Sequence, residues 1–489
     1  MSNFQQKIIR GIVWTALQNW GGQFGSLLVF FVLARLLQPE DFGLVALANV
    51  FLAFIQIFLN QGFPQALIQQ QQQLEAEHIN TAFWTNLVSG CVLTLLCVIL
   101  APFVADAFDQ PQLTPILRCF SLLLLINSFT DVQEALLQRQ FKFKFVALRS
   151  LLGLFLGGIA GVVAALSGLG VWSLVVQQLV YESVGAIVLW RASDWRPQLQ
   201  FSWPHFHRLF GFGINILAFN FLGFINTRSD DLLIGYFLGP VALGYYSIAY
   251  RILKIMVQLL IDTVNQVALP TFSRLQSDLS AFRSTFYKAT QLTSLIAFPC
   301  FLGVAVLAPD IVPLLFGKQW APSVPVLQWL SIAGVFSSVS RFKGAIFMAM
   351  GKPSWRVWIG LLASALNIAF FTFAVRWGIA AVGLAYLVRT VIMFPIEQGA
   401  VGRLIKVSIG DYLRQLVMPL TSAVLMSVTI LGAQQVISLE SLPILQVIIM
   451  SLIGAVTYIG LLRLLAPKLF KQLLEIITPL LPKLRHKGA

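Results

Sequence analysis

The sequence predicts an all-α polytopic membrane protein, on the basis of three observations. Of its 489 residues, 58% are hydrophobic and 11% are charged, whereas a soluble protein averages about 25% charged residues. The mean hydropathy is +0.82. Apolar segments of membrane-spanning length recur along the chain, separated by short stretches of Pro, Gly and charge, and the lysines and arginines concentrate in alternate connections between them.

About fourteen transmembrane helices are expected, because each crossing needs about 20 apolar residues. They cover residues 11–37, 42–68, 79–105, 113–137, 146–167, 170–190, 206–238, 241–268, 286–308, 322–350, 355–376, 378–402, 411–433 and 443–465. Two six-helix lobes, 1–200 and 201–405, with two additional helices in 406–465, form the simplest grouping. Residues 466–489 space apolar side chains between lysines, which predicts an amphipathic helix on the cytoplasmic surface.

An internal repeat supports the two lobes. The turn LLQPEDFGL at 36–44 resembles FLGPVALGY at 237–245, so that Pro39 aligns with Pro240 and Gly43 with Gly244. GLGVWSL at 168–174 resembles GIAAVGL at 378–384 in the same way. An even number of spans separates the copies, which therefore keep the same orientation in the membrane, as expected for parallel repeats.

The distribution of cations predicts the topology. With the N-terminus in the cytoplasm, connections on that side hold most of the 33 lysines and arginines, and those on the other side hold Arg35, Lys318 and Arg376. This asymmetry follows the positive-inside rule, so both termini are expected in the cytoplasm of a cell with a bacterial plasma membrane. Most of the net charge of +14 would then face anionic lipid.

Charged residues inside one expected helical hairpin, 224–258, point to function. The hairpin turns at Gly239-Pro240, with Asp230 ten residues before Pro240 and Arg251 eleven after it. At the rise of an α-helix both lie about 15 Å from the turn, in the middle of a hydrocarbon core about 30 Å thick. A charge at that depth normally faces a protein interior or a watery cavity.

Polar residues are expected to share one face on three helices. In the second arm of the hairpin they are Arg251, Lys254, Gln258, Asp262 and Asn265. In the first hairpin of the chain they are Thr15, Gln18, Gly22 and Ser26 on one helix and Asn49, Gln56 and Asn60 on the other. These stripes predict a cavity with amides on one wall and cations on the other. Ion pairs and amides that merely fix helix packing are the alternative explanation.

Sequence motifs for enzymatic chemistry are absent. The chain lacks GxxxxGK[ST], HExxH and GxSxG, and its four cysteines have no CxxC spacing. We therefore expect no catalytic residues, no cofactor, no metal and no nucleic-acid partner, and transport is favoured over catalysis.

The segment TRSDDLLIGYFLGPVALGYYSIAYRI, the turn LLQPEDFGL and the fourteen-span plan resemble one family. It is the polysaccharide-transporter branch of the multidrug, oligosaccharidyl-lipid and polysaccharide exporter superfamily, the Wzx-like flippases. The resemblance implies a V-shaped pair of bundles around a cavity lined by helices 1, 2, 7 and 8. It also implies movement of undecaprenyl-pyrophosphate-linked oligosaccharides to the outer leaflet. Asp230 and Arg251 match the family's acidic and basic positions, whereas Asp231 stands where a polar or basic residue is usual.

A specific division of roles follows. Arg228, Arg251 and Lys254 would bind an anionic headgroup, with Asp230 and Asp262 holding these cations or binding a coupling proton or Na⁺. The amides expected to bond sugar hydroxyls are Gln18, Asn49, Gln56 and Gln258. The expected partners are the lipid-linked oligosaccharide, membrane lipids, and polysaccharide polymerase and export proteins. The alternatives are a lipid II flippase, a cation-coupled multidrug exporter and a membrane glycosyltransferase or ligase.

Overall fold

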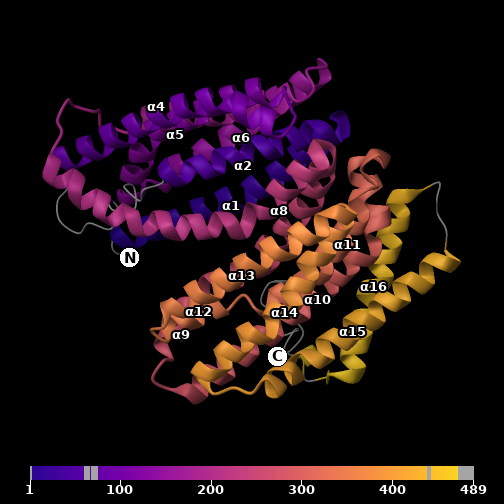
Figure 1. Ribbon diagram of the computed structural model, residues 1–489. Helices are drawn as coiled ribbons and strands as arrows, with labels where there is room; N and C mark the ends of the chain where they lie inside the picture. The colour runs from indigo at the N-terminus through magenta and orange to yellow at the C-terminus, as the bar shows by residue number, and fades with distance from the viewer. Residues whose placement is uncertain (1–2, 60–66, 68–74, 438–441, 468, 472–489) are drawn as a thin grey trace. The chain divides into compact units, whose positions relative to one another are not determined.

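The computed structural model describes residues 3–59, 67, 75–437, 442–467 and 469–471, and every regular element in this part of the chain is a helix (Figure 1). The first eight are α1 (Asn3–Leu36), α2 (Pro39–Leu59), α4 (Ala76–Ala107), α5 (Leu113–Arg139), α6 (Phe143–Leu166), α7 (Trp172–Ala192), α8 (Trp203–Val257) and the π-helical turn η1 (Gln258–Asp262). The others are α9 (Thr263–Arg274), α10 (Leu279–Phe316), η2 (Lys318–Trp320), α11 (Ser323–Val339), α12 (Lys343–Ala349), α13 (Pro353–Ala374), η3 (Val375–Trp377), α14 (Ile379–Ile405), α15 (Ile409–Val436) and α16 (Pro443–Leu465). Most of the expected amphipathic tail, 472–489, lies outside the described residues.

The all-α polytopic prediction is confirmed, and its count of fourteen spans is approximate. Within the described residues, twelve segments are long and apolar enough to cross a membrane. One of them, Asn220–Ile261, has 42 residues and departs from helical geometry at Gly239. A straight helix of that length would extend about 63 Å, twice the hydrocarbon core, so this segment provides two crossings. α1 is long enough for another crossing but is too polar to be among the twelve.

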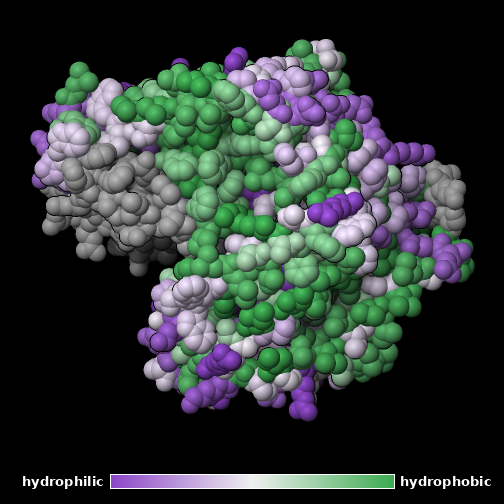
Figure 2. Space-filling view, in the orientation of Figure 1, coloured by the Kyte–Doolittle hydropathy of each residue, from purple (hydrophilic) through white to green (hydrophobic). Residues whose placement is uncertain are grey.

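The surface has the character of a membrane protein. Hydrophobic side chains spread along α14 and α15, and hydrophilic side chains gather at helix ends (Figure 2). Large apolar residues such as Phe103, Trp358 and Val456 are more than 60% exposed. Such exposure is expected where the surrounding solvent is lipid rather than water.

The chain forms two compact units, Met1–Ser247 (unit 1) and Ile248–Ala489 (unit 2). In unit 1, α6 packs closely against α7, because glycines one turn apart leave no side chain between the two helices. A Cβ added at Gly153 or Gly157 would lie 2.7 Å from a backbone oxygen of α7. This small-residue packing is typical of helices that associate inside a membrane. The two six-helix lobes with a boundary near residue 200 remain a prediction.

The two repeated turns of the sequence lie against each other in unit 1. A Cβ added at Gly43 would overlap the backbone carbonyl of Pro240, and one added at Gly244 would overlap that of Pro39. The contact is thus reciprocal, with each glycine of one repeat facing the proline of the other. This reciprocity is what a local two-fold relation between equivalent turns produces, and it gives the repeated Pro and Gly a physical reason.

In unit 2, the two C-terminal helices are bound to the others by buried tyrosines. Tyr412 of α15 donates to the Val339 carbonyl at 2.9 Å, and Tyr458 of α16 donates to the Leu295 carbonyl at 2.9 Å. Because Leu295 belongs to α10, the pair α15 and α16 packs against the long helix at the centre of unit 2 (Figure 1). The additional helices are therefore an integral part of this unit.

Asp310 of α10 forms hydrogen bonds with both C-terminal helices. Its two carboxylate oxygens accept from Gln434 of α15 at 2.7 Å and from Gln446 of α16 at 3.3 Å. The two amides give this carboxylate a structural role.

Asp310→Asn should lower the free energy of unfolding by about 1–2 kcal/mol, because one charge-assisted bond is lost and the other weakens. Thermal unfolding in detergent measures the change, with the exposed Asp106→Asn as the matched control. Equal unfolding midpoints for the two variants would show that the hydrogen bonds of Asp310 do not stabilise the protein.

Candidate functional site

The hairpin that carries the predicted charges folds back at Gly239, whose φ is 79°. The hydroxyl of Tyr246 donates to Asp230 at 2.7 Å. In a straight helix these two residues, sixteen apart, would be separated by about 24 Å. The contact therefore confirms that the two arms lie side by side, and Tyr246 is a partner that the sequence analysis missed.

The acidic residues of the first arm are buried and bonded. Asp230 is 3% exposed and also accepts from the backbone N–H of Asp231 at 3.1 Å. Asp231 is 6% exposed and pairs with Arg228 one turn earlier at 3.1 Å. Arg228 is more accessible, and this pair fixes its guanidinium on the hairpin.

A cavity of about 370 Å³ lies inside unit 1 beside Arg228. Four helices contribute to it, and its lining residues are Asn49, Leu52, Ala53 and Gln56 of α2, Leu123 and Asn127 of α5, Gln178 and Glu182 of α7, and Arg228 of α8. The structure thus brings together three of the predicted site residues, Asn49, Gln56 and Arg228. Asn127, Gln178 and Glu182 were not predicted.

Gln18, another predicted site residue, does not line this cavity. Its amide donates to the hydroxyl of Ser150 at 3.0 Å, which links α1 to α6. For Gln18 the geometry matches the alternative reading, an amide that joins neighbouring helices.

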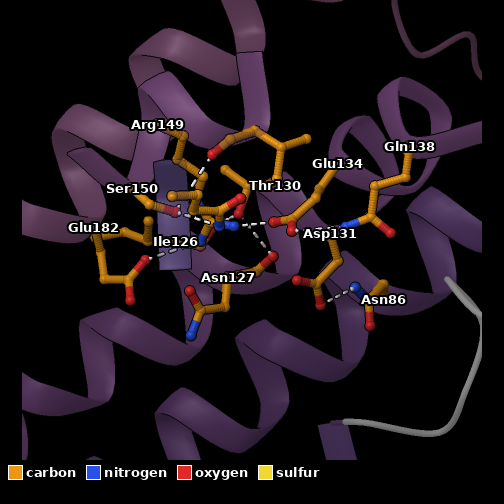
Figure 3. A network of polar contacts seen from close by, with 12 residues as sticks. Asn86, Ile126, Asn127, Thr130, Asp131, Glu134, Gln138, Arg149, Ser150 and Glu182 are labelled. Carbon is orange, nitrogen blue, oxygen red and sulfur yellow. Dashed lines mark hydrogen bonds and ion pairs between the residues drawn. The ribbon is translucent and has the colours of Figure 1, made fainter. Parts of the chain in front are cut away.

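The cavity borders a charged network centred on Arg149 of α6 (Figure 3). This guanidinium forms ion pairs with Glu134 of α5 and, at 3.1 Å, with Glu182 of α7. The side chains of Arg149 and Glu182 are 18% and 13% exposed. Since Glu182 also lines the cavity, Arg149 fixes the position of the acidic group in its wall.

A second carboxylate of α5 lies near the same network. Asp131 accepts from the amide of Asn86 on α4 at 3.1 Å (Figure 3). None of these charged residues was among the predicted site residues. The available signal was that Asp131, Glu134, Arg149 and Glu182 all fall within expected spans.

The predicted cationic stripe lies in unit 2. Arg251 and Lys254 lie on the second arm of α8, and Gln258 follows them at helical spacing; all three side chains are exposed. The π-helical turn η1 begins at Gln258, and such turns are frequent at functional sites. Asp262 ends this turn and Asn265 follows, but their side chains lie outside those that the structure describes.

These features define a class of protein: a polytopic helical bundle with a polar, charge-bearing cavity, as expected of a membrane transporter. A family model described as "Polysaccharide biosynthesis protein" matches residues 32–325. The chain belongs to this family, whose members are transporters and flippases rather than enzymes.

Two relatives and one solved structure illustrate the similarity. The chain is 24% identical to the teichuronic acid biosynthesis protein TuaB of Bacillus subtilis (strain 168), over 88% of this chain and 90% of that protein. It is 32% identical to the succinoglycan biosynthesis transport protein ExoT of Rhizobium meliloti (strain 1021), over 68% of each chain. The lipid II flippase MurJ in an inward closed conformation shares the fold, with a TM-score of 0.76, 14% identity, and 94% of this chain and 99% of that chain covered.

Proposed function

We propose that this chain moves a polyprenyl-diphosphate-linked oligosaccharide from the inner to the outer leaflet of a bacterial plasma membrane, for the synthesis of a cell-surface polysaccharide. The cavity of unit 1 is the observation that carries the proposal beyond family membership. It combines four amides with one arginine and one glutamate inside a membrane bundle. Such a lining suits a ligand rich in hydroxyls.

The chemistry of the lining fits a sugar. An amide both donates and accepts hydrogen bonds, as a hydroxyl does, so Asn49, Gln56 and Gln178 can each replace water around a saccharide. Burial without such replacement would cost several kcal/mol for each polar group. The cavity volume of about 370 Å³ falls within the range of small-molecule sites.

Cations complete the proposed path. Arg228 at the cavity of unit 1, and separately Arg251 and Lys254 of unit 2, are proposed to contact the diphosphate during transport while the polyprenyl chain stays in lipid. Arginine offers two parallel donors to a phosphate and lysine a point charge. Asp230 and Asp262 remain the proposed candidates for a coupling proton or Na⁺.

The setting in the cell is part of the proposal. Both termini would lie in the cytoplasm, as the positive-inside pattern predicts. The expected protein partners are the polymerase that joins the delivered units and the proteins that export the finished chain.

The test uses proteoliposomes with a fluorescent polyprenyl-diphosphate oligosaccharide. Protein-dependent exposure of the label to an impermeant quencher would support the proposal. An absence of lipid movement, together with expulsion of a cationic dye against a proton or Na⁺ gradient, would replace it with the multidrug exporter alternative.

Glu182→Gln tests the cavity itself. We expect the half-saturating concentration of the oligosaccharide lipid to rise about tenfold, since the wall loses a charge-assisted acceptor for sugar hydroxyls. The amount of folded protein should persist, because Arg149 keeps its ion pair with Glu134. The exposed Glu77→Gln is the matched control, and equal half-saturation of the two variants would exclude Glu182 from the sugar site.

A further inference from the structure

A second group of charges in unit 2 involves α12 and α14. Lys343, the first residue of α12, forms an ion pair with Glu397 of α14. Glu397 is 6% exposed. Arg389 of α14 and Arg341, just before α12, are close enough to act electrostatically on Lys343. Two further cations thus lie near the Lys343–Glu397 ion pair.

Arg389 is the member of this group with an unpartnered donor. Its Nε is buried and donates to no acceptor among the described residues. α14 begins at Ile379, which places Arg389 about 15 Å along the helix, near the middle of a crossing. A charge at that depth is costly in free energy, and an unpaired buried donor adds to the cost. An anion that the described chain does not supply would remove this cost.

The group adjoins the cationic stripe of α8. The rings of Tyr250 and Tyr386 meet edge to face with centroids 6.3 Å apart, which places α8 and α14 side by side in unit 2. Lys254 lies one turn after Tyr250, and Arg389 lies just under one turn after Tyr386. Three spans separate the second arm of α8 from α14 along the chain: α10, α11 together with α12, and α13. Because successive spans alternate in direction, the second arm of α8 and α14 run in the same direction. Lys254 and Arg389 therefore lie at similar depth.

We propose that Arg389, Lys343 and Arg341 form an anion site that binds a phosphate group, with Glu397 as the counter-ion of Lys343 when no anion is bound. Arginine and lysine supply the donors that a phosphate needs. Glu397 neutralises Lys343 in the absence of ligand and competes with an entering anion. With the diphosphate of the transported lipid as its ligand, this inference rests on the proposed function. The headgroup of an anionic phospholipid would bind through the same phosphate chemistry.

Titration of purified full-length protein with inorganic pyrophosphate, in nanodiscs of phosphatidylcholine, tests the site. We expect Arg389→Gln and Lys343→Gln each to weaken binding about tenfold, since each removes a charge-assisted contact. Glu397→Gln should instead tighten binding several-fold, because the competing carboxylate is gone. Opposite changes from neighbouring substitutions cannot arise from misfolding. The exposed Arg376→Gln is the matched control and should bind as wild type does.

Two further arms identify the source of the phosphate. In the first arm, the polyprenyl-diphosphate oligosaccharide competes with pyrophosphate for binding. If it displaces pyrophosphate from wild type but not from Arg389→Gln, the site binds the transported substrate. The second arm replaces phosphatidylcholine with phosphatidylglycerol in the nanodiscs. If this replacement weakens pyrophosphate binding by wild type but not by Arg389→Gln, the site binds a lipid headgroup. Equal pyrophosphate affinity of wild type, Arg389→Gln and Glu397→Gln, or no binding by wild type, would overturn the proposal. A failed flipping assay would overturn the proposed function and leave these binding results unchanged.

Discussion

Arg251→Gln should reduce translocation of the polyprenyl-diphosphate oligosaccharide at least about a hundredfold, without reducing the protein in the membrane. The Arg251 side chain is exposed, in line with Lys254 and Gln258, near the middle of a crossing. A cation at that depth faces a cavity or another protein surface rather than lipid. Two charge-assisted bonds to a diphosphate contribute about 1.5–3 kcal/mol each, which sets the size of the effect.

The quencher assay in proteoliposomes measures this effect, with the protein content of each preparation matched. Arg251→Lys should fall between wild type and Arg251→Gln, because lysine keeps the charge but not the paired donors. Arg463→Gln changes an exposed arginine of α16 and is the control. Normal translocation by Arg251→Gln would remove Arg251 from the transport path.

Alanine at Gly43 or Gly244 should destabilise the protein by about 2–3 kcal/mol and impair translocation. At each position the new Cβ would overlap a backbone carbonyl of the opposite turn. A backbone group cannot rotate away as a side chain can, so the two turns would have to separate. Because the contact is reciprocal, the two substitutions should have similar effects.

Thermal unfolding and the quencher assay together check this second prediction. The control is Gly223→Ala, where an added Cβ meets nothing within 4 Å. If Gly43→Ala or Gly244→Ala unfolds at the same midpoint as the control, the two turns can separate without loss of stability, and the prediction is wrong. A large effect at one glycine alone would contradict the reciprocal relation.

Part of the site was predictable because its residues break the apolar pattern locally. Asp230 and Arg251 interrupt long apolar helices, and the cost of such charges makes them visible in sequence. The tight turn at Gly239-Pro240 was predictable for a similar reason, since this pair ends a helix. Partners such as Tyr246 were not, because a tyrosine in an apolar segment has no sequence signature of the carboxylate that it contacts.

The Arg149 network shows what sequence could not settle. Arg149 lies near the end of an expected span, where a topology signal and a buried ion-pair partner look alike. Its carboxylate partners, Glu134 and Glu182, are separated from it by 15 and 33 positions and belong to different helices. Only the packing of α5, α6 and α7 places them together.

The sequence alone determined the all-α membrane fold, the approximate number of crossings and the repeated turns. These follow from apolar length, charge placement and helix-breaking residues, which act locally along the chain. The tertiary structure decided that Asn49, Gln56 and Arg228 share a cavity with Glu182, whereas Gln18 joins two helices. It also placed Gly43 on Pro240 and Gly244 on Pro39. Helix period fixes which face a residue occupies, but only close packing fixes which faces meet.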